Sequence, residues 1–395
     1  MNLTFTKETK ALCCISLAWF LVLAGRYSIS NLLPQIVTEL HISWTDAGFA
    51  LTMMWLVYAA IQFPSGIYSD IKGRKKTILI SMAIFAVSYF FVGLSMHYTM
   101  FFFAVFLLGA GTGGYPAVGI SMITDLFKEK RGRALGIRES AGSLAYAIPI
   151  VAALIASVYS WRFFFIVWAG LCGFSIFLFH RQTTESTTLP KTVSVKERVI
   201  DGMSIFKQKN IQLIFVVNLL IAITWISYMS FFPALLVVEK GFTQIQAAFA
   251  LAILGLGGFI VKPIIGSFSD RYNKKIIIIL LSVFTALGTL AIVSTDSMIL
   301  IFVISFVPSL ATAIFPVISS YLMDQWEEKG RAGKLGFFRS TLILLASPSS
   351  ATIGFLADRY NFNIPFIGLS IILFITAGLL VFNVLLFHKK PSASL

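Results

Sequence analysis

The sequence predicts an all-α integral membrane protein with twelve transmembrane helices in two pseudo-symmetric six-helix bundles. Hydrophobic residues make up 57% of the 395 residues and charged residues only 12%, against about 25% charged residues in soluble domains. The basic residues stand in short clusters between long apolar segments, as they do in membrane proteins. The two halves of the chain also repeat one another at an offset of 200 residues. The composition excludes a soluble enzyme and a disordered or fibrous chain.

Twelve apolar segments are each long enough for a helix that crosses a bilayer, which needs about 20 residues. We expect these helices at 11–36, 46–69, 77–96, 99–124, 134–159, 162–180, 211–237, 244–268, 276–294, 297–323, 335–357 and 363–387. The longest polar stretch, 181–210, contains six Lys and Arg residues, a proline and a Ser/Thr run. It predicts a linker with one short amphipathic helix, between an N-terminal bundle at 1–180 and a C-terminal bundle at 211–395.

The placement of Lys and Arg predicts the orientation in the membrane. Of the 31 basic residues, 24 fall at the termini, in the central linker or in the connections on that same side. The opposite side has only Arg162, Lys240 and Arg359. Because basic residues mark the cytoplasmic side, we expect a multi-pass protein of the cytoplasmic (inner) membrane with both termini and the linker in the cytoplasm. The first apolar segment is too long for a signal peptide, so we interpret it as the first span.

The internal repeat covers both loops and helix starts. Gly66, Ser69, Asp70 and Lys75 recur as Gly266, Ser269, Asp270 and Lys275, and Arg131, Leu135, Gly136 and Ser140 recur as Arg331, Leu335, Gly336 and Ser340. Six helices in each half keep the two halves the same way up, so the repeat axis runs along the membrane normal. Two such bundles enclose a central cavity, and rocking one bundle against the other would open that cavity to alternate sides.

Three stretches of the sequence resemble the major facilitator superfamily. GIYSDIKGRKK, at 66–76, is similar to the family's G-x-x-x-D-x-x-G-R-K-K loop, and GSFSDRYNKK, at 266–275, is similar to a degenerate second copy. EKRGRALGI before the fifth helix, with Trp161 and Arg162 at the start of the sixth, is also similar to that family. The resemblance covers essentially the whole chain. It implies a secondary transporter with alternating access and not an enzyme.

The same resemblance implies gating residues. It suggests that Asp70 latches helix 11 and the loop between helices 4 and 5 when the cytoplasmic side is closed; the alternative is that the loop only determines topology. The charged residues that we assign to gating are Asp70, Arg74, Arg131, Glu139, Asp270, Arg331 and Arg339. Two departures count against a proton-linked multidrug exporter. Val105 stands near the position of the helix-4 arginine of many drug exporters, and Ile148-Pro149 replaces the Gly-Pro element of helix 5.

No cofactor, metal or nucleic-acid site is expected. Residues 109–114 match the dinucleotide pattern G-x-G-x-x-G, but they lie inside an apolar helix and do not follow a strand. Close helix packing explains these small residues better. No G-x-x-x-x-G-K-[ST] loop occurs, which disfavours transport driven by ATP. The three cysteines lack metal-ligand spacing, and the four histidines fall at helix ends or in loops.

Arg26 lies near the middle of the first helix. A central arginine costs about 2.5–3.5 kcal/mol on insertion scales, which is too much for a side chain that faces lipid. We therefore expect Arg26 to face the cavity and to bind an anion, with a structural bond to helix-end carbonyl groups as the alternative. The stretch from Arg26 to Pro34 also resembles the first helix of organic-anion and sugar-phosphate carriers within the family.

Helical spacing predicts further residues that line the cavity. Tyr58 and Gln62 share a face of helix 2 with Trp55, and Tyr146 follows Glu139 by seven residues on helix 5. For Tyr146 and for the helix-7 set of Asn218, Trp225 and Tyr228, ordinary packing is the alternative. The residues that we assign to substrate binding are Arg26, Tyr58, Gln62, Tyr146, Trp225, Tyr228 and Lys262.

Lys262 has two further interpretations. Eight residues before Asp270 on helix 8, it could snorkel to the surface. It is also at a depth similar to that of Glu139, so the two residues could pair between the bundles and hold the cytoplasmic gate closed. Gln62 and Arg339 would then form the weaker symmetric contact.

The deep charges of the helices are net positive, with Arg26 and Lys262 opposed only by Glu139. The leading hypothesis is therefore a carrier for a small organic anion, such as a carboxylate, a sugar acid or a phosphate ester. A coupling proton and a counter-anion both remain open. The expected partners are this small-molecule substrate and the lipid bilayer, with the protein working as a monomer. The alternative is an efflux permease for neutral or amphipathic compounds.

Overall fold

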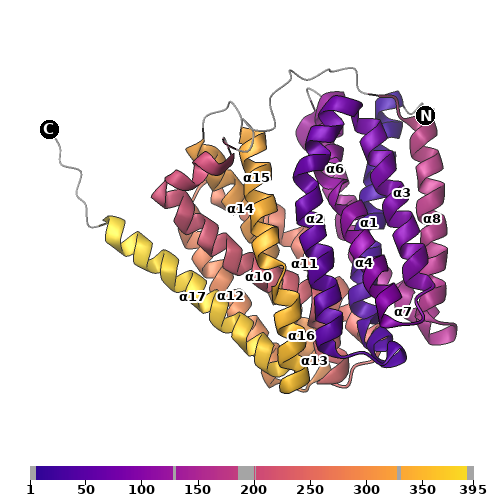
Figure 1. The fold of residues 1–395 in the computed structure, drawn as a ribbon. Helices are drawn as coiled ribbons and strands as arrows, with labels where there is room; N and C mark the ends of the chain where they lie inside the picture. The colour runs from indigo at the N-terminus through magenta and orange to yellow at the C-terminus, as the bar shows by residue number, and fades with distance from the viewer. Residues whose placement is uncertain (1–5, 128–129, 186–199, 201, 327–330, 389–395) are drawn as a thin grey trace, which may run out of the picture.

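The computed structural model describes residues 6–127, 130–185, 200, 202–326 and 331–388, and within these residues it contains helices and no strand (Figure 1). The first half consists of α1 (Lys7–Leu40), α2 (Trp44–Lys72), α3 (Arg74–Gly93), α4 (Tyr98–Gly113), α5 (Pro116–Leu126), α6 (Arg131–Leu144), η1 (Ala145–Ala147), α7 (Ile148–Val158) and α8 (Trp161–Gln182). The second half consists of η2 (Ile205–Lys207), α10 (Lys209–Val238), α11 (Gln244–Ser269), α12 (Lys274–Ser294), α13 (Met298–Ile304), η3 (Val307–Ser309), α14 (Leu310–Gln325), α15 (Arg331–Ala346), α16 (Ser349–Arg359) and α17 (Asn363–His388).

Twelve helical segments of the described chain are long and apolar enough to cross a membrane. Eight of them are single helices, and the other four are interrupted. The interrupted spans are the fourth (α4 and α5), the fifth (α6, η1 and α7), the tenth (α13, η3 and α14) and the eleventh (α15 and α16). The predicted all-α fold with twelve membrane helices is confirmed. Half of the linker predicted at 181–210, namely residues 186–199 and 201, lies outside the described residues.

Each interruption lies at a proline. Pro116 begins α5, Pro149 lies in the first turn of α7, Pro308 lies in η3, and Pro348 precedes α16. Proline lacks the backbone N–H and its ring clashes with the preceding turn, so a helix bends or breaks there. Pro116 interrupts its span in this way, whereas Pro316, 200 residues further along the chain, lies inside the continuous helix α14.

The helices without deep charges lie on the outside. α3 packs against α8 and α12 packs against α17. Each of these four helices exposes large apolar side chains, for example Phe90 on α3, Phe174 on α8, Phe284 on α12 and Phe382 on α17. A membrane protein presents such a surface to lipid. The third, sixth, ninth and twelfth spans therefore form the outer surface of the two halves.

The two halves meet through central helices. α2 packs against α15 and α16, α1 packs against α10, and α7 packs against α11. In Figure 1, α2 lies beside α15 and α16 near the centre of the molecule. We call the end where α1 begins and α2 finishes the basic end, because Lys72, Arg74 and Lys75 lie there. The end where α2 begins and α16 finishes is the opposite end.

Candidate functional site

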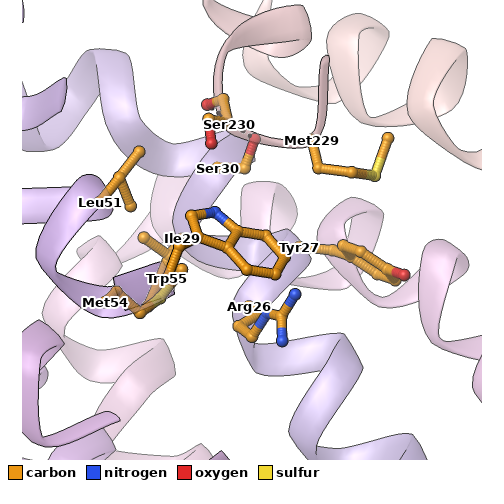
Figure 2. Close-up of a pocket in the computed structure, with 9 residues that line it drawn as sticks. All are labelled: Arg26, Tyr27, Ile29, Ser30, Leu51, Met54, Trp55, Met229 and Ser230. Atoms are coloured by element: carbon orange, nitrogen blue, oxygen red, sulfur yellow. Dashed lines mark hydrogen bonds between the residues drawn. The ribbon is translucent and has the colours of Figure 1, made fainter. Parts of the chain in front are cut away.

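Arg26 of α1 lies against two aromatic rings of α2. Its guanidinium carbon is 4.1 Å from the centre of the Trp55 ring and 5.1 Å from the centre of the Tyr58 ring. Figure 2 shows the guanidinium group directed toward the Trp55 ring. Such cation–π contacts are worth about 0.5–2 kcal/mol, depending on desolvation. Among the described residues, no carboxylate lies within ion-pair distance of Arg26, so the aromatic faces stabilise a charge that has no counterion.

A small cavity adjoins Arg26 where the two halves meet. Its volume is about 20 Å³, enough for one water molecule. Nine residues line it: Arg26, Tyr27, Ile29, Ser30, Leu51, Met54, Trp55, Met229 and Ser230 (Figure 2). On its rim the Ser30 hydroxyl of α1 donates to the Ser230 carbonyl oxygen of α10, at 3.1 Å. The cavity therefore combines one cation, hydroxyl groups and apolar and aromatic surfaces from both halves.

Tyr146 joins the two halves beside this cavity. Its ring stacks on Tyr27 with the ring centres 4.0 Å apart. Its hydroxyl lies 3.6 Å from the Met229 sulfur of α10. A methyl group added to Gly255 of α11 would lie 2.1 Å from the Tyr146 ring, so the glycine is what allows α11 this close. Tyr146 is thus buried between the halves, in contact with Tyr27 and Met229, which line the cavity.

Gln62 lies at a contact between the halves, nearer the basic end than Tyr58. Its side-chain oxygen accepts a hydrogen bond from the Ser340 hydroxyl of α15, at 3.3 Å. One residue further along α2, Phe63 packs on Phe337 of α15 with ring centres 6.2 Å apart. The partner of Gln62 is therefore Ser340 and not the adjacent Arg339 that the repeat predicts, and the Arg339 side chain is exposed.

Glu139 and Lys262 do not form the predicted pair in this conformation. The Glu139 carboxylate instead forms an ion pair with Arg138 of the same helix, α6. Lys262 is exposed on α11 and has no ion pair among the described residues. The two residues interact electrostatically at longer range. Adjacency on one helix supplies Glu139 with a nearer partner than Lys262.

Arg138 is a charged residue that the sequence reasoning missed. Its side chain is 1% exposed, and its guanidinium carbon lies 4.1 Å from the Trp19 ring centre and 5.8 Å from the Tyr115 ring centre. The sequence carried a signal for it. Ala134, Arg138 and Gly142 recur every four residues and are all buried, so Arg138 occupies the inward face of α6.

For the seventh span, which is α10, the structure corrects the prediction for Tyr228 and refines the prediction for Trp225. Tyr228 does not line the cavity beside Arg26: it is buried inside the second half, where its hydroxyl donates to Thr289 of α12 at 2.6 Å. Its ring packs on Phe232 and Phe366. Trp225 is half-buried on the same helix. A spacing of three residues places both on neighbouring faces of α10, but only the packing of α12 and α17 decides which face is inward.

The predicted gating residues of the loop at 66–76 form a cluster at the basic end. Arg74 pairs with Asp70 at 3.2 Å and also with Asp125 at the end of α5. In the second half Lys274 pairs with Asp324 at the end of α14. These pairs hold equivalent helices of each half together. Arg131 and Asp270 are exposed, and the side chain of Arg331 lies outside the described residues.

The opposite end is closed by a carboxylate from the other half. Asp358 of α16 accepts hydrogen bonds from the backbone N–H groups of Trp44 and Thr45 at 3.0 and 2.7 Å, and from the Thr45 hydroxyl at 2.6 Å. Trp44 and Thr45 are the first residues of α2, whose N–H groups lack partners within the helix. Asp358 therefore caps α2 across the boundary between the halves, where the helix dipole also favours a negative charge.

A recess opens on the other side of this end, between α1, α7, α8, α10 and α11. Its volume is about 750 Å³, and Thr38, Tyr159 and Gln244 are among the residues that line it. Both polar atoms of the Gln244 side chain are buried without a hydrogen-bond partner among the described residues. No group of three or more His, Cys, Asp or Glu side chains in the described chain could hold a metal ion.

Comparison with known proteins places the chain in a family. The family model described as Major Facilitator Superfamily matches residues 15–332 and 214–394. The chain is 27% identical to the hexuronate transporter of Bacillus subtilis (strain 168), over 65% of this chain and 64% of that protein. It is 25% identical to the multidrug resistance protein MdtL of Shewanella sp. (strain ANA-3), over 72% of each.

A solved structure has the same fold. It is the inward-facing, unoccupied form of a bacterial homolog of the human lysosomal transporter Spinster, with a TM-score of 0.79. That match covers 98% of this chain and 99% of the other at 15% sequence identity, so it concerns the fold alone. The family match spans nearly the whole chain and agrees with the twelve spans and the two bundles. The chain belongs to the major facilitator superfamily and is a membrane transporter, not an enzyme.

Proposed function

We propose that this transporter carries a small organic anion across the cytoplasmic membrane by alternating access, and that Arg26 binds the anionic group of the substrate. The observation that supports this most is the uncompensated charge of Arg26 beside the cavity between the halves. A carboxylate would supply the counterion that the described residues lack, with bidentate geometry suited to a guanidinium group. The similarity to a hexuronate transporter supports a sugar acid as the first substrate to test.

The aromatic and polar groups around Arg26 suit a polyhydroxylated anion. Trp55 and Tyr58 offer ring faces, and Ser30 and Ser230 offer hydroxyl and carbonyl groups. A sugar acid presents a carboxylate at one end and hydroxyl groups along its length. The closed cavity holds only one water molecule, so substrate binding requires the halves to separate around Arg26, as alternating access does.

Efflux of neutral or amphipathic compounds is the second candidate. The similarity to MdtL and the apolar lining by Leu51, Met54 and Met229 support it. In that case Arg26 would hold α1 against α2 through its aromatic contacts and would not meet an anion. The two candidates therefore make opposite predictions for variants of Arg26.

Binding and uptake of glucuronate by purified protein in proteoliposomes test the proposal. Arg26→Ala should abolish binding while the protein stays folded, and Arg26→Lys should weaken binding by less, because it keeps the charge and loses the bidentate geometry. Arg359→Ala, which removes an exposed arginine at the opposite end, is the matched control. Wild-type binding by Arg26→Ala would contradict the anion site and favour the efflux candidate.

The orientation remains part of the proposal. We infer from the basic clusters that the basic end, with both termini, faces the cytoplasm. Single cysteines introduced at Lys72 and Lys240 should differ in labelling by a membrane-impermeant thiol reagent applied to intact cells. The position at Lys240 should react and the position at Lys72 should not; the reverse pattern would invert the assignment.

A further inference from the structure

Three buried amide atoms near the recess at the opposite end have no hydrogen-bond partner among the described residues. They are Oδ1 of Asn31 on α1, and Oε1 and Nε2 of Gln244, the first residue of α11. Asn31 is fully buried, and its Nδ2 atom donates to the Gln244 carbonyl oxygen at 3.4 Å. Buried polar atoms in proteins are nearly always hydrogen-bonded, so these three atoms indicate a partner that the described chain does not supply.

Asn31 lies between the recess and the cavity beside Arg26. On α1 it comes four residues after Tyr27, which lines that cavity (Figure 2), and four residues before Gln35, which lines the recess. Residues four apart share a face of a helix, so one stripe of α1 runs from the cavity past Asn31 to the recess. The stripe from Tyr27 to Gln35 is about 12 Å long. The unpaired amide atoms therefore lie on the route from the recess to Arg26.

The recess can admit a small anion. Its volume of about 750 Å³ is within the range of small-molecule sites. Among the described residues that line it, Glu39 carries the only carboxylate, which pairs with Arg162 and accepts a hydrogen bond from Trp161 Nε1. An entering anion thus meets no uncompensated negative charge. On the other flank of this end, Asp358 bonds α16 to the start of α2, so the recess lies on the flank without that closure.

Gln244 is the side chain of this pair that can move. The capping box at the start of α11 uses the side chains of Thr243 and Gln246, and not that of Gln244. Gln244 is half-buried and lines the recess. Because neither of its side-chain polar atoms is hydrogen-bonded within the described chain, rotation of Gln244 toward the recess breaks no such bond. This rotation would present its amide group to a molecule in the recess and uncover Asn31 behind it.

We propose that the recess is an outer binding site for the hydroxyl groups of the substrate, and that Asn31 and Gln244 select hydroxylated anions over anions without hydroxyl groups; the inference rests on the anion carrier proposed above. A hydroxyl group both donates and accepts. It donates to Asn31 Oδ1 or Gln244 Oε1 and accepts from Gln244 Nε2. An acid without hydroxyl groups leaves the two amide oxygens unpaired and is disfavoured for that reason. The outer site therefore recognises a different part of the substrate from the part that binds Arg26.

Occupancy of the recess can be measured with a cysteine placed in it. Thr38→Cys puts a thiol among the residues that line the recess, and peptide mass spectrometry follows maleimide labelling at that position in the purified full-length protein. Glucuronate should slow the labelling. Hexanoate, a six-carbon acid without hydroxyl groups, should need a concentration about tenfold higher for the same effect, which corresponds to one net hydrogen bond. Equal protection by the two acids would overturn the proposal, and protection by neither would mean that only water reaches the amide atoms.

Substitution of the amide side chains tests their role in this preference. Asn31→Leu and Gln244→Met, each combined with Thr38→Cys, remove the amide groups at similar side-chain volume and should bring the two acids to nearly equal protection. Asn363→Leu is the matched control, because Asn363 lies at the same end with a buried, unpartnered Oδ1 and is not among the described residues that line the recess. It should keep the tenfold preference. If Asn31→Leu does not fold, Gln244→Met at the half-buried start of α11 decides the result. A preference that persists in Gln244→Met would overturn the proposal.

Arg26→Ala separates this inference from the proposed function. Because the outer site recognises hydroxyl groups and does not use Arg26, the combination of Arg26→Ala with Thr38→Cys should keep the protection by glucuronate, at concentrations well above those of the Arg26 binding assay. Loss of protection in this combination would show that the recess has no site of its own. Wild-type glucuronate binding by Arg26→Ala would contradict the proposed anion site, and the comparison of glucuronate with hexanoate would still decide whether the recess selects hydroxyl groups.

Discussion

Two pairs of helices that the internal repeat makes equivalent close the opposite end in different ways. In the first pair, α2 and α16, Asp358 caps the start of α2, and the Thr52 hydroxyl donates to the Ser347 carbonyl and accepts from the Ala351 N–H. In addition, a methyl group added to Gly354 would lie 2.1 Å from the Trp44 carbonyl oxygen. This pair is joined by charge-assisted bonds and by direct backbone contact.

The second pair, α11 and α7, lacks these features. The residues 200 positions from Asp358 and Thr52 are Val158 and Ala252, and neither can take part in a hydrogen bond through its side chain. The capping box of Thr243 and Gln246 satisfies the start of α11 from within its own half. The recess of about 750 Å³ lies beside this pair.

The difference shows that a repeated fold does not distribute its bonds symmetrically. The helices of both pairs follow from the same apolar pattern, whereas the bonds between the halves depend on single side chains such as Asp358. The stability of the closed end is therefore concentrated in α2 and α16. Variants of α2 and α16 should therefore alter the opposite end more than variants of α11 and α7.

Gly354→Ala should have the largest effect. Its methyl group would overlap the Trp44 carbonyl oxygen, which cannot move without shifting the start of α2. We expect α2 and α16 to separate, at a cost of about 1–3 kcal/mol to the closed end. Spin-label distances across the opposite end should lengthen. Gly368→Ala on α17, where no atom lies within 4 Å of the added group, is the control and should leave them unchanged. An unaltered distance in Gly354→Ala would show that the contact is not rigid.

Asp358→Asn should have an intermediate effect. It keeps the size of the side chain but removes the charge from three hydrogen bonds to α2, which should weaken the closed end by about 1 kcal/mol. A cysteine placed near Thr45 should become more reactive toward thiol reagents. Asp296→Asn alters a highly exposed aspartate at the same end that pairs with Lys240, and it should leave this reactivity as it is. Equal effects of Asp358→Asn and Asp296→Asn would show that Asp358 does not stabilise this end more than the exposed Asp296 does.

Val158→Asp should have the smallest effect, of the opposite sign. It places a carboxylate at the position equivalent to Asp358, near the start of α11, where the helix dipole favours it by about 0.5 kcal/mol. We expect slower labelling of a cysteine in the recess beside Gln244. Val158→Asn, similar in size and uncharged, should not slow it. Faster labelling in Val158→Asp would mean that α11 and α7 are not arranged like α2 and α16.

The sequence predicts the membrane helices well because the bilayer demands long apolar segments. The deep position of Arg26 and the shared face of Tyr58 and Gln62 follow from helical spacing in the same way. Contacts between different helices cannot be predicted from the spacing of residues within one helix. Tyr228 turns toward Thr289 because α12 lies behind α10, and no spacing within α10 indicates that.

In this conformation the partner of Glu139 is its neighbour in the sequence. Glu139 pairs with Arg138 and not with Lys262, because a partner on the next residue needs no movement of the halves. Arg138 itself is buried against Trp19 and Tyr115, which come from two other helices. Its inward position was readable from the four-residue spacing of α6, but its aromatic surroundings required the three-dimensional arrangement.

The stacking of Arg26 on Trp55 and Tyr58 has a consequence for the speed of turnover. Without substrate the guanidinium group rests on ring faces, so a carboxylate that bound Arg26 as proposed would replace one favourable environment with another. The favourable free energy of binding is then smaller than it would be for a guanidinium group without such contacts. A smaller gain means a faster dissociation rate, since affinity differences among related complexes lie mostly in dissociation. The aromatic pair thereby favours a carrier that releases its substrate quickly over a receptor that retains it.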